Sequence, residues 1–390
     1  MQQKKYNKTA GWLLDLNAKQ SAAYSTPEAK IKRRLYREQH PTEIGAFKCM
    51  DGRLNLPVFT ETPPGIIQPF RTMGGIFDLG DERLGRIVED SVKYAQKMRR
   101  RYLPLCTYHF SKGKQHRGCA GHKYDTIAGI KGAKRLAEQF RFFHGKVSND
   151  GFGYEVYPVV AGMETDMEAL VFNSKDGKIF SIADHVDASR ETCTEKLREI
   201  FPDMPKRMFD DLLEPVIRNQ HHVRELKKLD REPIDLEHRE STICFGRGFD
   251  WLHTPNKALI IGPFGNDLSD SIVTAGNLLV QNIEKGRIDP LNGIVIMTAG
   301  LYYEEGMNRN RINLKAYELY TYIKKVLEKN VPELFKACDV QYLVGVTSHD
   351  TRAFTEIDVT EYEKRFDDDF SVSPEEKEAI TVTEEVTALQ

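Results

Sequence analysis

Two short segments of the sequence carry residue types that bind a borderline-soft divalent metal. Residues 46–53 offer a thiol at Cys49, a carboxylate at Asp51 and a guanidinium at Arg53, and residues 116–121 offer His116 and Cys119 three positions apart. Cysteine thiolate and neutral imidazole are ligands that zinc prefers, and the His-x-x-Cys spacing lets one tight turn aim both at one ion. Together the two segments predict a zinc site.

A ligand set of two cysteines and one histidine would leave the fourth position of a tetrahedral zinc ion open. Three protein ligands and an open position are typical of catalytic zinc, because a water molecule can bind there and become more acidic. Side chains alternate between faces on an extended segment, so we expect Cys49, Asp51 and Arg53 to point the same way. The carboxylate would then lie beside the metal, held by the guanidinium.

Two histidines compete for the imidazole position. His109 lies nearer the end of an apolar stretch that predicts a strand, and His116 follows an inserted basic segment, 110–115. We favour His116, because only this residue stands at the His-x-x-Cys spacing. His109 stays open as the alternative ligand.

The order Cys-x-Asp-x-Arg, followed about sixty residues later by His-x-x-Cys, resembles the active-site signature of the β-class carbonic anhydrases. The resemblance covers about 90 residues, 46–135, and includes an Arg-containing segment (68–75), a helix (84–98) and a strand (103–108) between the two motifs. The chain departs from the family pattern in the insertion at 110–115 and in Ala120, which separates Cys119 from Gly121.

The resemblance implies a zinc-dependent enzyme that reversibly hydrates carbon dioxide to bicarbonate with zinc-bound hydroxide. Zinc would be held by Cys49, His116 and Cys119, Asp51 would accept a hydrogen bond from the hydroxide, and Arg53 would keep Asp51 ionised. The family also implies a homo-oligomer, a dimer or a multiple of dimers, in which an N-terminal arm wraps a neighbouring subunit.

Two other functions remain open. The same fold and metal set resemble those of enzymes that hydrolyse carbon disulfide or carbonyl sulfide. The proline-containing loop 54–69 or the insertion 110–115 could reshape the entrance to the site and so change the substrate. The other alternative is a non-catalytic, zinc-stabilised scaffold protein. The pair formed by Asp51 and Arg53 argues against a scaffold, because a structural zinc site has no need of it.

The composition describes a globular protein with a near-neutral surface. The 390 residues are 40% hydrophobic and 29% charged, with a formal net charge of −2, which argues against a nucleic-acid-binding protein. No apolar run is long enough to span a membrane, and the polar, basic first thirty residues contain no apolar signal segment. Six scattered cysteines indicate a reducing compartment, and we expect a cytoplasmic protein.

Strand patterns alternate with amphipathic helix patterns from residue 46 to residue 345, which predicts an α/β fold with a mostly parallel central sheet and flanking helices. We divide the chain into an N-terminal helical arm (1–40), a zinc-binding domain (41–150), a strand and helix connector (151–250), a second α/β unit (251–350) and an acidic C-terminal tail (351–390).

The second α/β unit resembles the zinc-binding domain in the order of its elements. Residues 258–265 align with 46–53, residues 268–283 again form a helix pattern, and residues 294–301 align with 103–110, but the metal-binding residue types are absent. A duplication that lost its metal would make an internal pseudo-dimer. The alternative is a chance similarity between two strand–helix–strand units.

Overall fold

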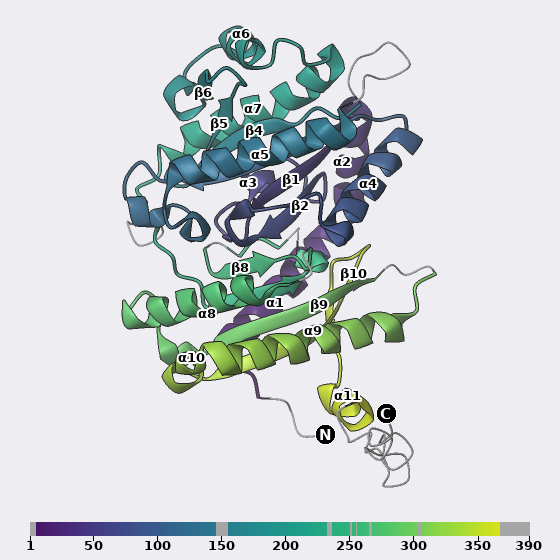
Figure 1. Cartoon of the computed structure of the whole chain (residues 1–390), viewed down its shortest axis with the longest axis vertical. Coiled ribbons are helices and arrows are strands. Elements are labelled where there is room, and N and C mark those ends of the chain that lie inside the picture. The colour runs from purple at the N-terminus through teal and green to yellow at the C-terminus, as the bar shows by residue number, and fades with distance from the viewer. Residues whose placement is uncertain are drawn as a thin grey trace, which may run out of the picture.

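The chain folds into two α/β halves, each built on its own sheet (Figure 1). The computed structural model describes residues 5–145, 155–231, 236–249, 252–254, 256–264, 267–302 and 306–366. The strands are β1 (Glu43–Cys49), β2 (Ile67–Thr72), β3 (Tyr102–Phe110), β4 (Val159–Glu164), β5 (Ala169–Asn173), β6 (Ile179–Ser181), β7 (Thr242–Gly246), β8 (Ala258–Ile261), β9 (Ile294–Tyr302), β10 (Val340–Ser348) and β11 (Phe354–Glu356).

Helices surround both sheets. They are α1 (Lys8–Ser25), α2 (Pro27–Gln39), α3 (Leu56–Phe59), α4 (Glu82–Lys97), α5 (Thr126–His144), α6 (Arg190–Ile200), α7 (Lys206–Leu226), α8 (Ser269–Glu284), α9 (Arg309–Asn330), α10 (Pro332–Ala337) and α11 (Val359–Phe366). Within the described ranges, none of these helices combines the length and apolar character needed to cross a bilayer.

The first sheet has the strand order β2-β1-β3-β4-β5-β6, in which β2, β1, β3 and β4 are parallel and the last two strands are antiparallel to their neighbours. Helices α4 and α5 cover one face through a core that contains Phe47, Val88 and Phe140. Helices α6 and α7 cover the other face. Both faces are therefore buried, which explains why β1 and β3 are apolar along most of their length.

The second sheet repeats the topology of the first five strands of the first sheet, and β6 has no counterpart in it. Its order is β11-β10-β9-β7-β8, so β8, β7, β9, β10 and β11 take the places of β2, β1, β3, β4 and β5. As in the first sheet, four strands are parallel and the fifth is antiparallel to its neighbour. The connecting helices also match, with α8 in the place of α4 and α9 in the place of α5. The α/β architecture is confirmed, and the shared strand order is what a duplicated domain would have.

The topology corrects the alignment of the repeat. The sequence comparison laid residues 258–265, which contain β8, on β1, whereas the counterpart of β1 is β7. The alignment of β9 with β3 agrees with the strand order. Continuing the β1–β3 and β7–β9 registers along that alignment puts Gly246 at the position of Cys49 and Gly300 at that of His109. The second half therefore has glycines where the first half has two potential metal ligands.

The two sheets meet where their edge strands β2 and β8 lie side by side. Ile260 donates its backbone N–H to the Met50 carbonyl at 2.8 Å, Gly262 donates to the Arg71 carbonyl at 2.9 Å, and Asp51 and Leu259 form an antiparallel bridge. One apolar cluster also runs from the first half into the second. Pairing the edges satisfies backbone groups that an exposed edge would leave open to association with other chains.

Helix α1 packs on the second sheet of its own chain. Ala10 and Leu13 are buried against a cluster that includes Cys244, Val295 and Met297. The side chain of Asn7 caps the helix by accepting from the N–H of Ala10. These α1 contacts join the N-terminus to the second half of the same polypeptide. The expected reach of the arm to a neighbouring subunit stays a prediction.

Two of the expected segments belong to the sheets. Strands β4, β5 and β6 extend the first sheet and β7 starts the second, so residues 151–250 are part of both units and not a connector. Residues 351–366 contain β11 and α11, and the remainder of the expected acidic tail, 367–390, lies outside the described residues.

The junction between the sheets leaves no room for a side chain at residue 52. A Cβ atom at Gly52 would lie 2.0 Å from the backbone oxygen of Ala258. We expect Gly52→Ala to lower the free energy of unfolding by about 2 kcal/mol, because the backbone of one edge must move away from the other.

Chemical denaturation measures this change against Gly11→Ala in α1, where a Cβ would meet nothing within 4 Å. The control should be neutral or more stable by about 0.5–1 kcal/mol, because alanine favours a helix. Equal stability of Gly52→Ala and the wild type would contradict the close packing at this junction.

Candidate metal centre

Three side chains that can bind a metal converge at the carboxyl ends of neighbouring parallel strands. Cys49 is the last residue of β1, His109 is the penultimate residue of β3, and Cys119 precedes a short 3-10 turn at Ala120–His122. Their potential ligand atoms lie within 4.8 Å of one another, and the two Sγ atoms are 3.8 Å apart. Ligands in open parallel sheets commonly bind at this end of the strands.

The chemistry of the three side chains fits a zinc ion. Both ring nitrogens of His109 are buried, and neither makes a hydrogen bond to the part of the chain that the structure describes. The hydrogen bond with Cys119 and then burial raise the pKa of the Cys49 thiol, while the same hydrogen bond lowers the pKa of Cys119. Two buried thiols in hydrogen-bond contact, with an imidazole facing them, form a donor set suited to zinc.

The structure brings His109, and not His116, to the two cysteines. The side chain of His116 is 47% exposed and its Nε2 atom lies 2.9 Å from a carboxylate oxygen of Glu237, outside the group. His109 takes its place beside Cys49 and Cys119. The reason is the length of β3, which continues to Phe110 and carries His109 to the level of Cys49, while the following loop turns His116 outward.

Asp51 and Arg53 form a buried ion pair next to this group. The Arg53 Nη2 atom lies 2.6 Å from Asp51 Oδ2, its Nε donates to both carboxylate oxygens, and its backbone N–H donates to Oδ1 at 2.9 Å. Burial raises the pKa of Asp51, but the Arg53 guanidinium outweighs this effect and holds the pKa far below its usual range. The carboxylate is therefore ionised at neutral pH.

The second half of the chain fixes the guanidinium of Arg53. Its Nη1 donates to the carbonyl of Leu236 at 2.9 Å, and its Nη2 lies 3.1 Å from Nε2 of His238. His238 contacts the buried carboxylate of Glu240 through Nδ1, at 2.9 Å, and Asn282 donates to the other oxygen of that carboxylate at 3.1 Å. The segment before β7 thus completes a chain of contacts that ends at Asp51.

Asp51, His238 and Glu240 also lie within 4.8 Å of one another through their potential ligand atoms. The Arg53 guanidinium contacts two of the three and already supplies a positive charge to this group. This second cluster is better described as the surroundings of a bound guanidinium than as another metal site.

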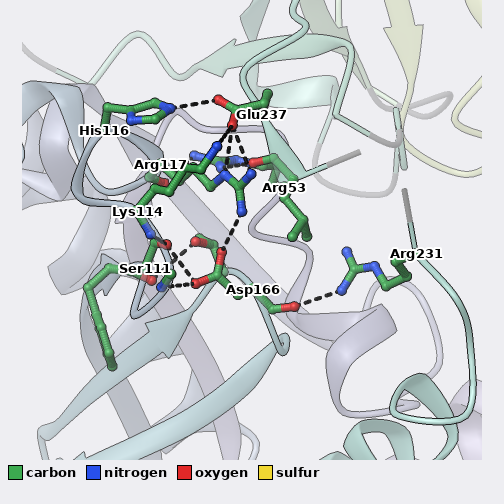
Figure 2. Close-up of polar contacts among 12 residues, drawn as sticks. Arg53, Ser111, Lys114, His116, Arg117, Asp166, Arg231 and Glu237 are labelled. Carbon is green, nitrogen blue, oxygen red and sulfur yellow. Dashed lines mark hydrogen bonds and ion pairs between the residues drawn. The ribbon is translucent and has the colours of Figure 1, made fainter. Parts of the chain in front are cut away.

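The loop between β3 and Cys119 is held by two carboxylates (Figure 2). Glu237 accepts from Nε of Arg117 at 2.9 Å and contacts His116, and Asp166 accepts from the Ser111 hydroxyl at 2.6 Å and from the N–H of Gly113 at 2.9 Å. The carbonyl of Arg117 also accepts from Arg53 at 2.9 Å. These contacts connect the approach to Cys119 with the guanidinium that orients Asp51.

A pair of glycines lets the backbone pass closely beside the centre. Gly74 and Gly75 both have φ of +67°, and a Cβ at Gly75 would lie 3.2 Å from the backbone nitrogen of Cys49. Such positive φ angles favour glycine. The backbone therefore passes close to Cys49 here, and His122 contacts the carbonyl of Gly74 at 2.9 Å.

The residues that support Arg53 were not anticipated from the sequence. His238 and Glu240 occupy alternate positions before a strand, which places their side chains on one side of an extended segment. This spacing was a usable signal, but it lies about 185 residues from Arg53 in the chain.

The fold and the grouped cysteines and histidine are similar to those of proteins of the β-carbonic-anhydrase type. More specifically, residues 40–198 match the family model described as the carboxysome shell carbonic anhydrase, catalytic domain. The matched segment contains Cys49, Asp51, Arg53, His109 and Cys119. No curated protein sequence matches the chain.

Glu237→Gln tests how much the carboxylate at the loop contributes to stability. Burial raises the pKa of Glu237, but Arg117 and His116 lower it more, so that it falls from 4.5 to about 2. A carboxylate with a lowered folded-state pKa stabilises the fold fully above its unfolded pKa and loses that contribution as the pH falls toward the folded value. Between pH 5.5 and 3 we expect the metal-free wild type to lose about 2 kcal/mol more stability than the variant.

Urea denaturation of both metal-free proteins at the two pH values measures the difference. The same loss of stability in the wild type and in Glu237→Gln would show that Glu237 has an ordinary pKa and does not hold the loop.

Proposed function

We propose that the chain is a zinc-dependent carbonic anhydrase whose metal is held by Cys49, His109 and Cys119. The observation that carries the proposal is the convergence of these three buried ligands beside an ionised carboxylate. A structural zinc site is closed by four protein ligands, whereas this group offers three and leaves one position for a reacting molecule. The match of residues 40–198 to a carbonic anhydrase catalytic domain supports the same reaction.

The protein side chains would prepare the reaction around the metal. Zinc, when bound, supplies the Lewis acid that makes a water molecule reactive toward carbon dioxide near neutral pH. Asp51 accepts a hydrogen bond from the attacking water and orients its lone pair toward the substrate. Arg53 keeps Asp51 ionised and prevents it from turning, because three of its contacts fix the guanidinium from the other side.

The alternative activity, hydrolysis of carbon disulfide or carbonyl sulfide, would use the same residues. An assay with a panel of these substrates and carbon dioxide separates the two activities. The hypothesis of a non-catalytic scaffold protein has less support. The buried ion pair of Asp51 and Arg53 is costly to desolvate, and a structural zinc site gains nothing from it. A protein that binds zinc but neither hydrates carbon dioxide nor hydrolyses carbon disulfide or carbonyl sulfide would favour the scaffold hypothesis.

Replacing each candidate histidine by alanine distinguishes the two ligand sets. We expect His109→Ala to lose most of its bound zinc and its hydration activity, because one of three ligands is removed. His116→Ala should keep stoichiometric zinc, since its imidazole contacts Glu237 at the surface. Metal analysis after gel filtration provides the comparison, and loss of zinc from His116→Ala with retention in His109→Ala would restore the spacing-based assignment.

Replacing Asp51 by asparagine tests its role in orienting the attacking water. We expect Asp51→Asn to retain zinc and to lose hydration activity by about 100-fold or more, in the range of losses seen when a positioned proton acceptor is removed. Stopped-flow hydration assays and zinc content are measured on the same samples. Asp184→Asn, which alters an exposed carboxylate, is the matched control.

Full activity in Asp51→Asn would remove this residue from the proposed reaction. If the variant loses both zinc and thermal stability, Asp51→Asn combined with Arg53→Gln removes the uncompensated buried charge. That double variant should bind zinc but remain inactive.

A further inference from the structure

The chain turns back toward the metal centre immediately after Cys119. Tyr124 donates its backbone N–H to the Cys119 carbonyl at 2.8 Å, and Lys123 donates to the carbonyl of Ala120 at 2.9 Å. Helix α5 begins two residues after Tyr124, and the side chain of Asp125 caps its first turn. Tyr124 is therefore held between a potential metal ligand and the start of a helix.

Lys123 and Tyr124 both adopt a left-handed backbone conformation, with φ of +52° and +63°. Residues that carry a Cβ atom avoid this region, because the Cβ approaches the following carbonyl oxygen, and two such residues in succession are unusual. Backbone of this kind persists where its surroundings impose it, and it is concentrated at functional sites. Glycine would fit the turn with less strain. A tyrosine at this position therefore points to a use for its side chain.

Packing in the core does not account for the side chain of Tyr124. The residue is half-buried and belongs to none of the four apolar clusters that the described residues form. Its hydroxyl makes no hydrogen bond to any residue within the described ranges. The hydroxyl is therefore available to a molecule that enters the site.

The phenol of Tyr124 lies among charged groups that surround the metal centre. Burial raises the pKa of Tyr124, and the charges of four nearby residues act on it as well. Arg287 from the second half and Arg53 from the first half lower this pKa. Glu240 and the Cys119 thiolate raise it. A phenol in this position stays protonated near neutral pH and can donate a hydrogen bond.

Other polar groups of the centre are already engaged. Asp51 is ionised, so its carboxylate accepts hydrogen bonds and cannot donate one. Arg53 directs N–H groups to Asp51 and to the carbonyls of Leu236 and Arg117. The Tyr124 hydroxyl is a donor near the centre that is not committed to these contacts.

We propose that Tyr124 is a further catalytic residue, whose hydroxyl donates a hydrogen bond to an oxygen of the reacting carbon dioxide and of the bicarbonate product. This inference rests on the proposed hydration reaction. Addition of a water oxygen to carbon dioxide places negative charge on the substrate oxygens, and a donor fixed beside them stabilises that charge. The strained turn from Cys119 to Asp125 would hold this donor in place before the substrate arrives.

Tyr124→Phe tests the proposal on the full, zinc-loaded chain, because it removes the hydroxyl and keeps the ring. We expect kcat/KM for carbon dioxide hydration, measured by stopped flow, to fall by about tenfold or more, since a donor to the developing charge is lost. Bound zinc and the midpoint of thermal unfolding should stay as in the wild type. Tyr94→Phe is the matched control, because it removes a tyrosine hydroxyl that lies 57% exposed on α4.

A second measurement does not depend on turnover. Cobalt(II) in place of zinc has visible absorption bands that respond to anions at the metal, so titration with bicarbonate gives a dissociation constant. This constant should rise by about fivefold or more in Tyr124→Phe, since one hydrogen bond to the anion is lost. It should be unchanged in Tyr94→Phe.

An unchanged kcat/KM in Tyr124→Phe, measured against an active wild type, would overturn the proposal and leave the proposed function in place. Loss of bound zinc from Tyr124→Phe would also overturn it, because the residue would then support the metal ligands and not the substrate. A zinc-loaded wild type that does not hydrate carbon dioxide would contradict the proposed function, and this inference with it.

Discussion

The buried pair of Asp51 and Arg53 is the constraint on which the candidate active site depends. A guanidinium taken out of water must have its charge compensated and its N–H groups hydrogen bonded. Asp51 supplies the charge, and the remaining contacts come from the carbonyls of Arg117 and Leu236 and from His238. The first half of the chain alone would leave the guanidinium incompletely bound. The site therefore needs the second half, even though its potential metal ligands all come from the first.

The arrangement of the two halves gives the second sheet a part in supporting the metal centre. The sheets meet at β2 and β8, so the carboxyl ends of one sheet lie near the lead-in segment of the other. At one such place, residues 236–240 support the metal centre. At the other, residues of α2 and residues near the ends of β7 and β9 line a cavity of about 950 Å³.

Local patterns in the sequence predicted the α/β class, the parallel strands and the residues Cys49, Asp51, Arg53 and Cys119 that the structure brings together. Residue spacing did not identify the histidine that lies beside the two thiols, because a spacing rule says nothing about where a strand ends. Strand β3 runs far enough to carry His109 to the thiols. The sheet partners of the connector and the support of Arg53 were also missed. These features depend on contacts across about 185 residues, and no local pattern specifies them.

X-ray absorption spectroscopy at the zinc edge, on protein loaded with one equivalent of zinc, tests the central claim most directly. The account predicts two sulfur ligands at about 2.3 Å and lighter ligands, including one imidazole, at about 2.0 Å. His116→Ala should leave the spectrum unchanged, and His109→Ala should remove the imidazole contribution. A zinc ion with fewer than two sulfur ligands, or an imidazole signal that disappears only with His116, would contradict the assignment of the centre to Cys49, His109 and Cys119.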